Sequence, residues 1–115
     1  MNNLTKDQAI LSQIEKDNGW VSNPLKLMAY RSGTVESFTN YCDQVFKNGT
    51  LTKREKALIS IAVTVALKSD HCIHTKIEEG KKHGLSDDEI VQTILIAGII
   101  NGNTMLHTAY EAMNQ

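Results

Sequence analysis

The feature that most constrains the fold is the run ALISIAVTVAL at residues 57–67, which is apolar apart from Ser60 and Thr64. These two polar residues are four apart, so on a helix they form one narrow stripe. Thr52 and Glu55 have capping-box spacing just before the run, which predicts a helix beginning after Thr52. A helix that is apolar on nearly every side needs cover on nearly every side. Because the run is shorter than the roughly 20 residues that span a bilayer, we expect the cover to be other helices, some from other subunits.

A second helix is predicted directly after this run. Ser69 or Asp70 is suited to cap it, because both side chains accept hydrogen bonds from free backbone N–H groups. His71 and Cys72 then lie in its first turn, where the partial positive charge of the helix end favours a thiolate and makes a cysteine reactive. Lys76 follows Cys72 by four residues and shares its helix face. His71 could shuttle a proton, although its side chain points about 100° away from Cys72.

The rest of the chain shows helical periodicity and turn residues, with no convincing strand alternation. Further helices are predicted at about residues 7–17, from Pro24 to before Ser32, at 34–47, from the capping box of Ser86 and Glu89 to about residue 100, and at 104–113. Asn101-Gly102-Asn103 is expected to interrupt the last apolar segment. The sequence therefore predicts an all-α fold of about six helices, in a single domain over residues 1–115.

Composition and the N-terminal sequence indicate which partners and which compartment to expect. The chain has 115 residues, a net charge of -1 and no block of basic residues, which argues against nucleic acid as a partner. The N-terminus MNNLTKDQAI has no apolar run like that of a signal peptide, so a cytoplasmic protein without a membrane partner is expected. Two cysteines do not make a disulfide framework, and a reducing compartment leaves both as free thiols. One of them, Cys42, lies on a regular apolar stripe of its helix and is expected in the core.

The flanking text LTKREKALISIAVTVAL and HGLSDDEIVQTILIAGIINGN, with Cys72 preceded by His71 between them, resembles the carboxymuconolactone decarboxylase superfamily. The similarity is greatest to its alkylhydroperoxidase (AhpD-like) branch, and it covers roughly Leu51 to Met113, with looser similarity back to Phe38. The resemblance implies an AhpD-like helical domain that forms a homo-oligomer, either a trimer or a hexamer. It also implies thiol chemistry on peroxides.

The site of this chain departs from the family pattern, which has a glutamate on the long helix, Cys-x-x-Cys at the start of the next, and a histidine four residues later. Cys72 corresponds to the second cysteine, but Ser69 stands in place of the first. Ala57 stands in place of the glutamate and Lys76 in place of the later histidine. Ser69 cannot close a disulfide, so a two-cysteine cycle is not expected. Cys42 could act as a remote resolving thiol only if the fold brings it to Cys72.

Three functions from different classes remain open. The first is a thiol-dependent, peroxidase-type antioxidant, in which the Cys72 thiolate attacks a peroxide and an external thiol is the reductant. Lys76 would stabilise the thiolate, and His71 or Ser69 would guide the proton of the leaving oxygen. The second is a decarboxylase or lactone-processing enzyme that binds a small carboxylate through Lys76 and His71. The third is a non-catalytic, oligomeric binding protein. The sequence favours the first, because Cys72 is the reactive group that it positions most clearly.

Each candidate residue also has a purely structural interpretation. Cys72 could be a small buried apolar residue, and Ser69 simply the helix cap. Lys76 could be a solvated lysine and His71 a solvent-facing residue of the first turn.

No cofactor is expected, and no metal site. His71, Cys72 and His74 are ligand types, but neighbouring positions on a helix face different ways, and no second cluster has zinc spacing. His74, His83 and His107 are expected at the surface or at an interface.

Overall fold

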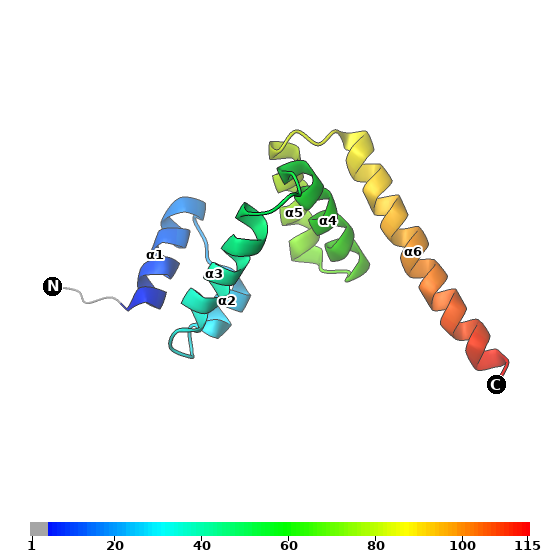
Figure 1. Ribbon diagram of the computed structural model, residues 1–115, viewed down its shortest axis with the longest axis horizontal. Coiled ribbons are helices and arrows are strands. Elements are labelled where there is room, and N and C mark those ends of the chain that lie inside the picture. Colours follow the sequence, from blue (N-terminus) through cyan, green and yellow to red (C-terminus); the bar gives the residue numbers. More distant parts are fainter. Residues whose placement is uncertain (1–4) are drawn as a thin grey trace. The chain divides into compact units, whose positions relative to one another are not determined.

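The structure is a computed structural model that describes residues 5–115 (Figure 1). In this part of the chain there are six helices and no strand, so the predicted all-α fold is confirmed. The helices are α1 (Lys6–Asn18), α2 (Asn23–Met28), α3 (Thr34–Lys47), α4 (Lys53–Ala66), α5 (Asp70–Lys82) and α6 (Asp87–Met113). They form two compact units: the first ends at Gly49, and the second comprises Thr50–Gln115. The single domain expected from the sequence stays a prediction.

In the first unit, α1 is joined to the beginning of α3 by a buried carboxylate. Asp7 is only 8% exposed, and it accepts hydrogen bonds from the backbone N–H groups of Gly33, at 2.8 Å, and Glu36, at 3.0 Å. Gly33 is the N-cap residue of α3 and has no side chain to cap it. Asp7 therefore caps α3 from another helix, where its charge also complements the helix dipole.

The predicted apolar stripe of α3 is only partly covered in this structure. Its bounds, Thr34–Lys47, are those predicted, and Val35 is fully buried. Tyr41 and Phe46, however, remain exposed. Cys42 is half-buried, so its expected place in the core is only partly realised.

In the second unit, α4 supplies the centre of the core. Its capping box is confirmed: Glu55 accepts from the Thr52 N–H at 2.8 Å, and the Thr52 hydroxyl accepts from the Glu55 N–H at 3.1 Å. The backbone bond from Thr52 lowers the pKa of Glu55. Ile61 is fully buried, and the core around it is completed by residues of all three helices and of the α5–α6 turn. These are Ala57, Leu85 and Ile90, with Leu58, Val65, Ile77 and Ile94 packed against them.

The turn between α5 and α6 is fixed at both ends. Gly84 has φ +83°, and Leu85 N–H donates to the Gly80 carbonyl at 3.0 Å, which closes α5 in a Schellman motif. Arg54 of α4 donates to the Gly84 carbonyl at 2.8 Å and also pairs with Glu89. Glu89 completes the predicted capping box of α6 and has a lowered pKa, first through the backbone hydrogen bond from Ser86.

The predicted interruption of the last helix is wrong. Asn101-Gly102-Asn103 lies inside α6, which runs without a break from Asp87 to Met113. Glycine costs a helix about 1 kcal/mol and asparagine less, and without a proline the long apolar flanks outweigh that cost. Alone among the described helices, α6 is long and apolar enough to cross a bilayer, a test that core helices of soluble proteins also pass.

Candidate functional site

The candidate site begins at the short turn between α4 and α5. Lys68 N–H donates to the Val65 carbonyl at 3.0 Å, and Ser69 N–H donates to the Thr64 carbonyl at 3.1 Å. These two bonds end α4 in a second Schellman motif, with Lys68 at the left-handed position, φ 56°. A side chain is rarely found there, and it costs on the order of 1 kcal/mol relative to glycine. Because this turn is short, the first residues of α5 lie close to the end of α4.

Ser69 occupies the N-cap position of α5, as predicted, but its side chain makes no cap hydrogen bond. The expectation that Ser69 or Asp70 caps the helix with its side chain is therefore wrong for Ser69, while Asp70 is already the first helical residue. The first backbone bond of α5 runs from Ile73 N–H to the Ser69 carbonyl, at 2.8 Å. The N–H groups of the residues between them precede the intrahelical ladder and carry the positive end of the helix dipole.

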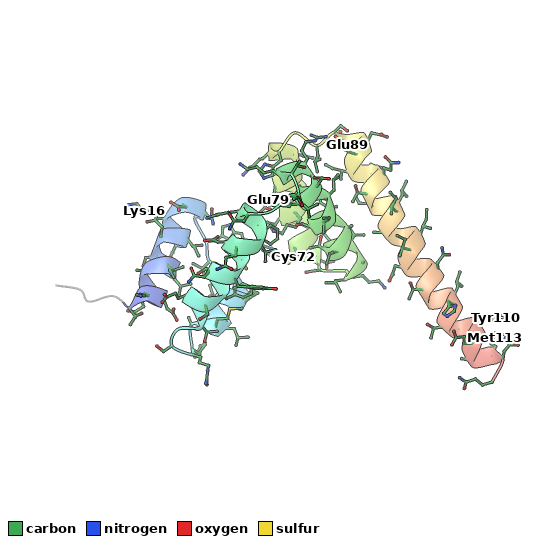
Figure 2. All side chains as sticks on the ribbon, in the orientation of Figure 1. Lys16, Cys72, Glu79, Glu89, Tyr110 and Met113 are labelled. Carbon is green, nitrogen blue, oxygen red and sulfur yellow. The ribbon has the colours of Figure 1, made fainter. Side chains whose placement is uncertain are left out.

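Cys72 lies in this first turn as a free, exposed thiol. Figure 2 shows it on α5, together with Glu79 further along the same helix. Lys76, one turn after Cys72, is 32% exposed at its side chain, and Ser69, one turn before, is half-buried. On an ideal helix the position of Lys76 lies about 40° from Cys72, whereas that of His71 lies about 100° away. Cys72 and Lys76 thus share one side of α5, Ser69 stands at its N-cap, and exposed His71 lies on another side.

The ion pair of Lys76 was not predicted. Its ammonium lies 3.3 Å from a carboxylate oxygen of Glu79, in an i,i+3 pair whose glutamate side chain is 49% exposed. The signal was present in the sequence, because Glu79 follows Cys72 by seven residues and so lies on the same helix face. Lys76 therefore forms a partly exposed ion pair within α5, and its role beside Cys72 stays a prediction.

The position at which the family has its glutamate is part of the core here. Ala57 is buried in the cluster around Ile61, so its methyl group packs among other apolar side chains. Glu55, the nearest carboxylate in sequence, is held by Thr52 at the start of α4. Ala57 has no group that can carry a proton, and the carboxylate of Glu55 is engaged in the capping box of α4.

The two cysteines belong to different units: Cys42 lies on α3 of the first unit, and Cys72 lies on α5 of the second. A resolving role for Cys42 stays a prediction. His74, His83 and His107 are exposed, as expected, and His107 pairs with Glu111 one turn further along α6. Among residues 5–115, no three or more His, Cys, Asp or Glu side chains are grouped so that they could hold a metal ion.

Comparisons with known proteins agree with this fold. A crystal structure of a protein from Methanobacterium thermoautotrophicum, a structural-genomics target, matches with a TM-score of 0.68 and 33% identity, over 71% of this chain and 94% of that one. A Paracoccus denitrificans protein described as uncharacterized protein 4 in the cox locus is 26% identical over 78 residues, 68% of this chain and 70% of that one. The carboxymuconolactone decarboxylase family model matches residues 33–115, which leaves α1 and α2 outside the match. The chain belongs to the carboxymuconolactone decarboxylase family.

Proposed function

We propose that this protein is a thiol-dependent peroxidase of the AhpD-like type, acting through Cys72. The observation that carries the proposal is an exposed, free thiol in the first turn of a 13-residue helix. The positive end of the helix stabilises a thiolate, and an exposed sulfur can be reached by a peroxide and by a second thiol.

The reaction is a one-cysteine cycle. The Cys72 thiolate attacks the nearer oxygen of a hydroperoxide, an S–O bond forms and the O–O bond breaks. A proton is delivered to the leaving oxygen, giving a sulfenic acid and an alcohol or water. One external thiol then condenses with the sulfenic acid, releasing water and leaving a mixed disulfide. A second external thiol attacks that disulfide, which releases Cys72 and an oxidised disulfide of the reductant.

The neighbours of Cys72 have distinct roles in this cycle. Ser69 is not engaged as a side-chain cap, so its hydroxyl is free of that duty and can donate to a bound peroxide. Lys76 contributes positive charge on the Cys72 face, reduced by its pairing with Glu79. His71 can exchange a proton with solvent at the helix end. Because this chain has no glutamate at position 57 and no histidine at position 76, we expect slower turnover than a complete relay gives.

We propose further that the protein acts as a homo-oligomer, a trimer or hexamer, whose interface includes α6. Between Val91 and Tyr110 this helix carries no Asp, Glu, Lys or Arg. Most of its large apolar side chains are exposed: Val91, Leu95, Ile96, Ile99, Ile100, Met105 and Leu106. An apolar surface of this extent usually marks an interface. Sedimentation of the full chain over a range of concentrations tests the assembly.

The experiment that tests the peroxidase proposal is peroxide treatment of the reduced protein with a dimedone-type sulfenic-acid trap, read by mass spectrometry. Wild type, Cys42→Ser and Cys72→Ser are compared. We expect rapid labelling that is lost in Cys72→Ser and kept in Cys42→Ser. Labelling no faster than that of the urea-unfolded chain would overturn the proposal. A disulfide that forms in wild type and is lost in Cys42→Ser would instead reveal Cys42 as a resolving thiol.

The family match keeps one alternative in view, a decarboxylase or lactone-processing enzyme on a small carboxylate. In that reaction Lys76 would bind the carboxylate, and Cys72 would be dispensable. A decarboxylase activity that survives Cys72→Ser and is lost in Lys76→Gln would favour this alternative over the peroxidase.

A further inference from the structure

We propose that Glu79 acts as a positioning residue that restrains the reactivity of Cys72, by pairing with the Lys76 ammonium on the same face of α5. The inference rests on the proposed role of Cys72 as the reacting thiol. It concerns Cys72, Lys76 and Glu79, whose spacing places them in a stripe along one face of α5; Figure 2 labels Cys72 and Glu79.

The helix register brings these three residues together. Lys76 follows Cys72 by four residues, so the two positions differ by about 40° around the helix and about 6 Å along it. Glu79 follows Cys72 by seven residues, which places it about 20° to the other side and about 10 Å along the helix. The stripe lies beside the buried face of α5, where Ile77 and Gly80 pack on the core of the unit.

The ion pair limits how strongly the positive charge of Lys76 acts on Cys72. Side chains on a helix lean toward its N-terminus, so an unpaired Lys76 would lean toward Cys72. In the structure the Lys76 Nζ lies 3.3 Å from a carboxylate oxygen of Glu79, so its positive charge is partly compensated by a negative one. Both side chains are partly exposed, so solvent screening makes the bond weak and the pair adjustable.

Glu79 therefore disfavours the thiolate form of Cys72 through two effects that act in the same direction. Its negative charge, about 10 Å along the helix, disfavours a thiolate, and its bond to Lys76 turns a nearby positive charge into a dipole. Removing the carboxylate relieves both effects. From Coulomb energies in water at these separations, we expect Glu79→Gln to speed the reaction of Cys72 by about two- to fivefold at low salt.

The test is a mutant cycle read by the alkylation of Cys72 in a Cys42→Ser background, so that one thiol reports. The rates with neutral iodoacetamide and anionic iodoacetate are compared for Glu79→Gln, Lys76→Gln and the double variant. A freed ammonium should accelerate the anionic reagent more than the neutral one, which a merely structural effect on α5 would not do. In the Lys76→Gln background, the effect of Glu79→Gln should fall to about twofold or less, since only the direct charge effect remains.

A matched control is available one residue away. Glu78 is exposed on the same helix and carries the same charge, but its position lies about 120° around the helix from Cys72. Glu78→Gln changes the net charge equally and should change the rates by less than the Glu79 variant does. Glu79→Asp retains the charge and tests whether the wild-type rate is restored.

The outcomes separate this inference from the peroxidase proposal. Equal effects of Glu79→Gln with and without Lys76, or equal effects of the Glu78 and Glu79 variants, overturn the positioning role. Fast peroxide oxidation of Cys72 that Glu79→Gln does not alter also overturns it, while leaving the peroxidase standing. If the predicted alkylation pattern is found but Cys72 does not react with peroxide, the role of Glu79 is supported and the peroxidase proposal is refuted.

Discussion

Replacing Asp7, whose carboxylate joins α1 to the start of α3, is the most demanding test of how the first unit is held together. The carboxylate is buried, and its two oxygens accept from two N–H groups at the start of α3, those of Gly33 and Glu36. Asp7→Ala removes both acceptors at once. Because Gly33 has no side chain, no other residue of the cap can take their place without a movement of the backbone.

The magnitude follows from these two bonds. The loss of an N-cap side chain costs about 0.5–2 kcal/mol, and the loss of a charge that complements the helix dipole costs a further 0.3–1 kcal/mol or so. Burial at 8% exposure places Asp7 toward the upper end of both ranges, because the abandoned N–H groups have little access to water. We expect Asp7→Ala to lower the free energy of unfolding by about 2–3 kcal/mol, a large part of the typical 5–15 kcal/mol.

Urea unfolding measures this loss. Trp20 is the single tryptophan of the chain and lies between α1 and α2, so its fluorescence reports on the first unit, while far-UV circular dichroism reports on all the helices. Glu15→Ala is the control, because Glu15 is an exposed carboxylate on the same helix. Loss of stability no greater for Asp7→Ala than for Glu15→Ala, with unchanged urea dependence, would refute the remote cap.

Three further predictions concern the second unit. Lys68→Gly should raise the free energy of unfolding by about 1 kcal/mol, and with it the midpoint of thermal unfolding, because glycine adopts the left-handed conformation of Lys68 without strain. An unchanged or lower midpoint would contradict this. Gly80→Ala should be less stable than Gly98→Ala by about 1–3 kcal/mol in urea unfolding, because a methyl group at Gly80 would lie 2.8 Å from a buried side chain and one at Gly98 meets nothing within 4 Å; equal stability would count against the close approach. Glu55 and Glu89 have pKa values lowered from 4.5, so the stability they confer is present above their unfolded pKa and is lost as the pH falls through the lower folded values. Acid unfolding followed by circular dichroism should therefore shift in the Glu55→Gln, Glu89→Gln double variant, whose stability depends less on pH in this range, and an unchanged pH dependence would refute the assignment.

The helix boundaries were predictable where local sequence decides them. The capping boxes that begin with Thr52 and Ser86 each depend on a partner three residues away, so the pattern in the sequence is the contact in the structure. The cap supplied by Asp7 joins residues 26 and 29 positions apart, and no local pattern announces it. The same distinction explains α6, where Asn101-Gly102-Asn103 has the composition of a turn but the long helix on either side sets the outcome.

The candidate site was predictable in its register but not in its contacts. Spacing alone places Cys72 and Lys76 on one face of α5, because an α-helix fixes which residues are neighbours. Spacing does not say which partner a flexible side chain chooses. Lys76 had Cys72 one turn before it and Glu79 nearly one turn after it, and it pairs with the carboxylate. Likewise, Ser69 stands at the N-cap position that the sequence indicates, without making the bond that the position usually brings.

The substitutions at the family positions, taken together with these contacts, change where the electrostatic control of Cys72 can come from. Position 57, where the resemblance places the family's glutamate, holds a buried alanine. The charges that remain close in sequence to Cys72 on its own face, Lys76 and Glu79, both belong to α5. Both side chains are partly exposed, so solvent would screen the proposed control of Cys72. If Glu79 has the proposed role, a single neutral substitution at this exposed position would alter that control without disturbing the core.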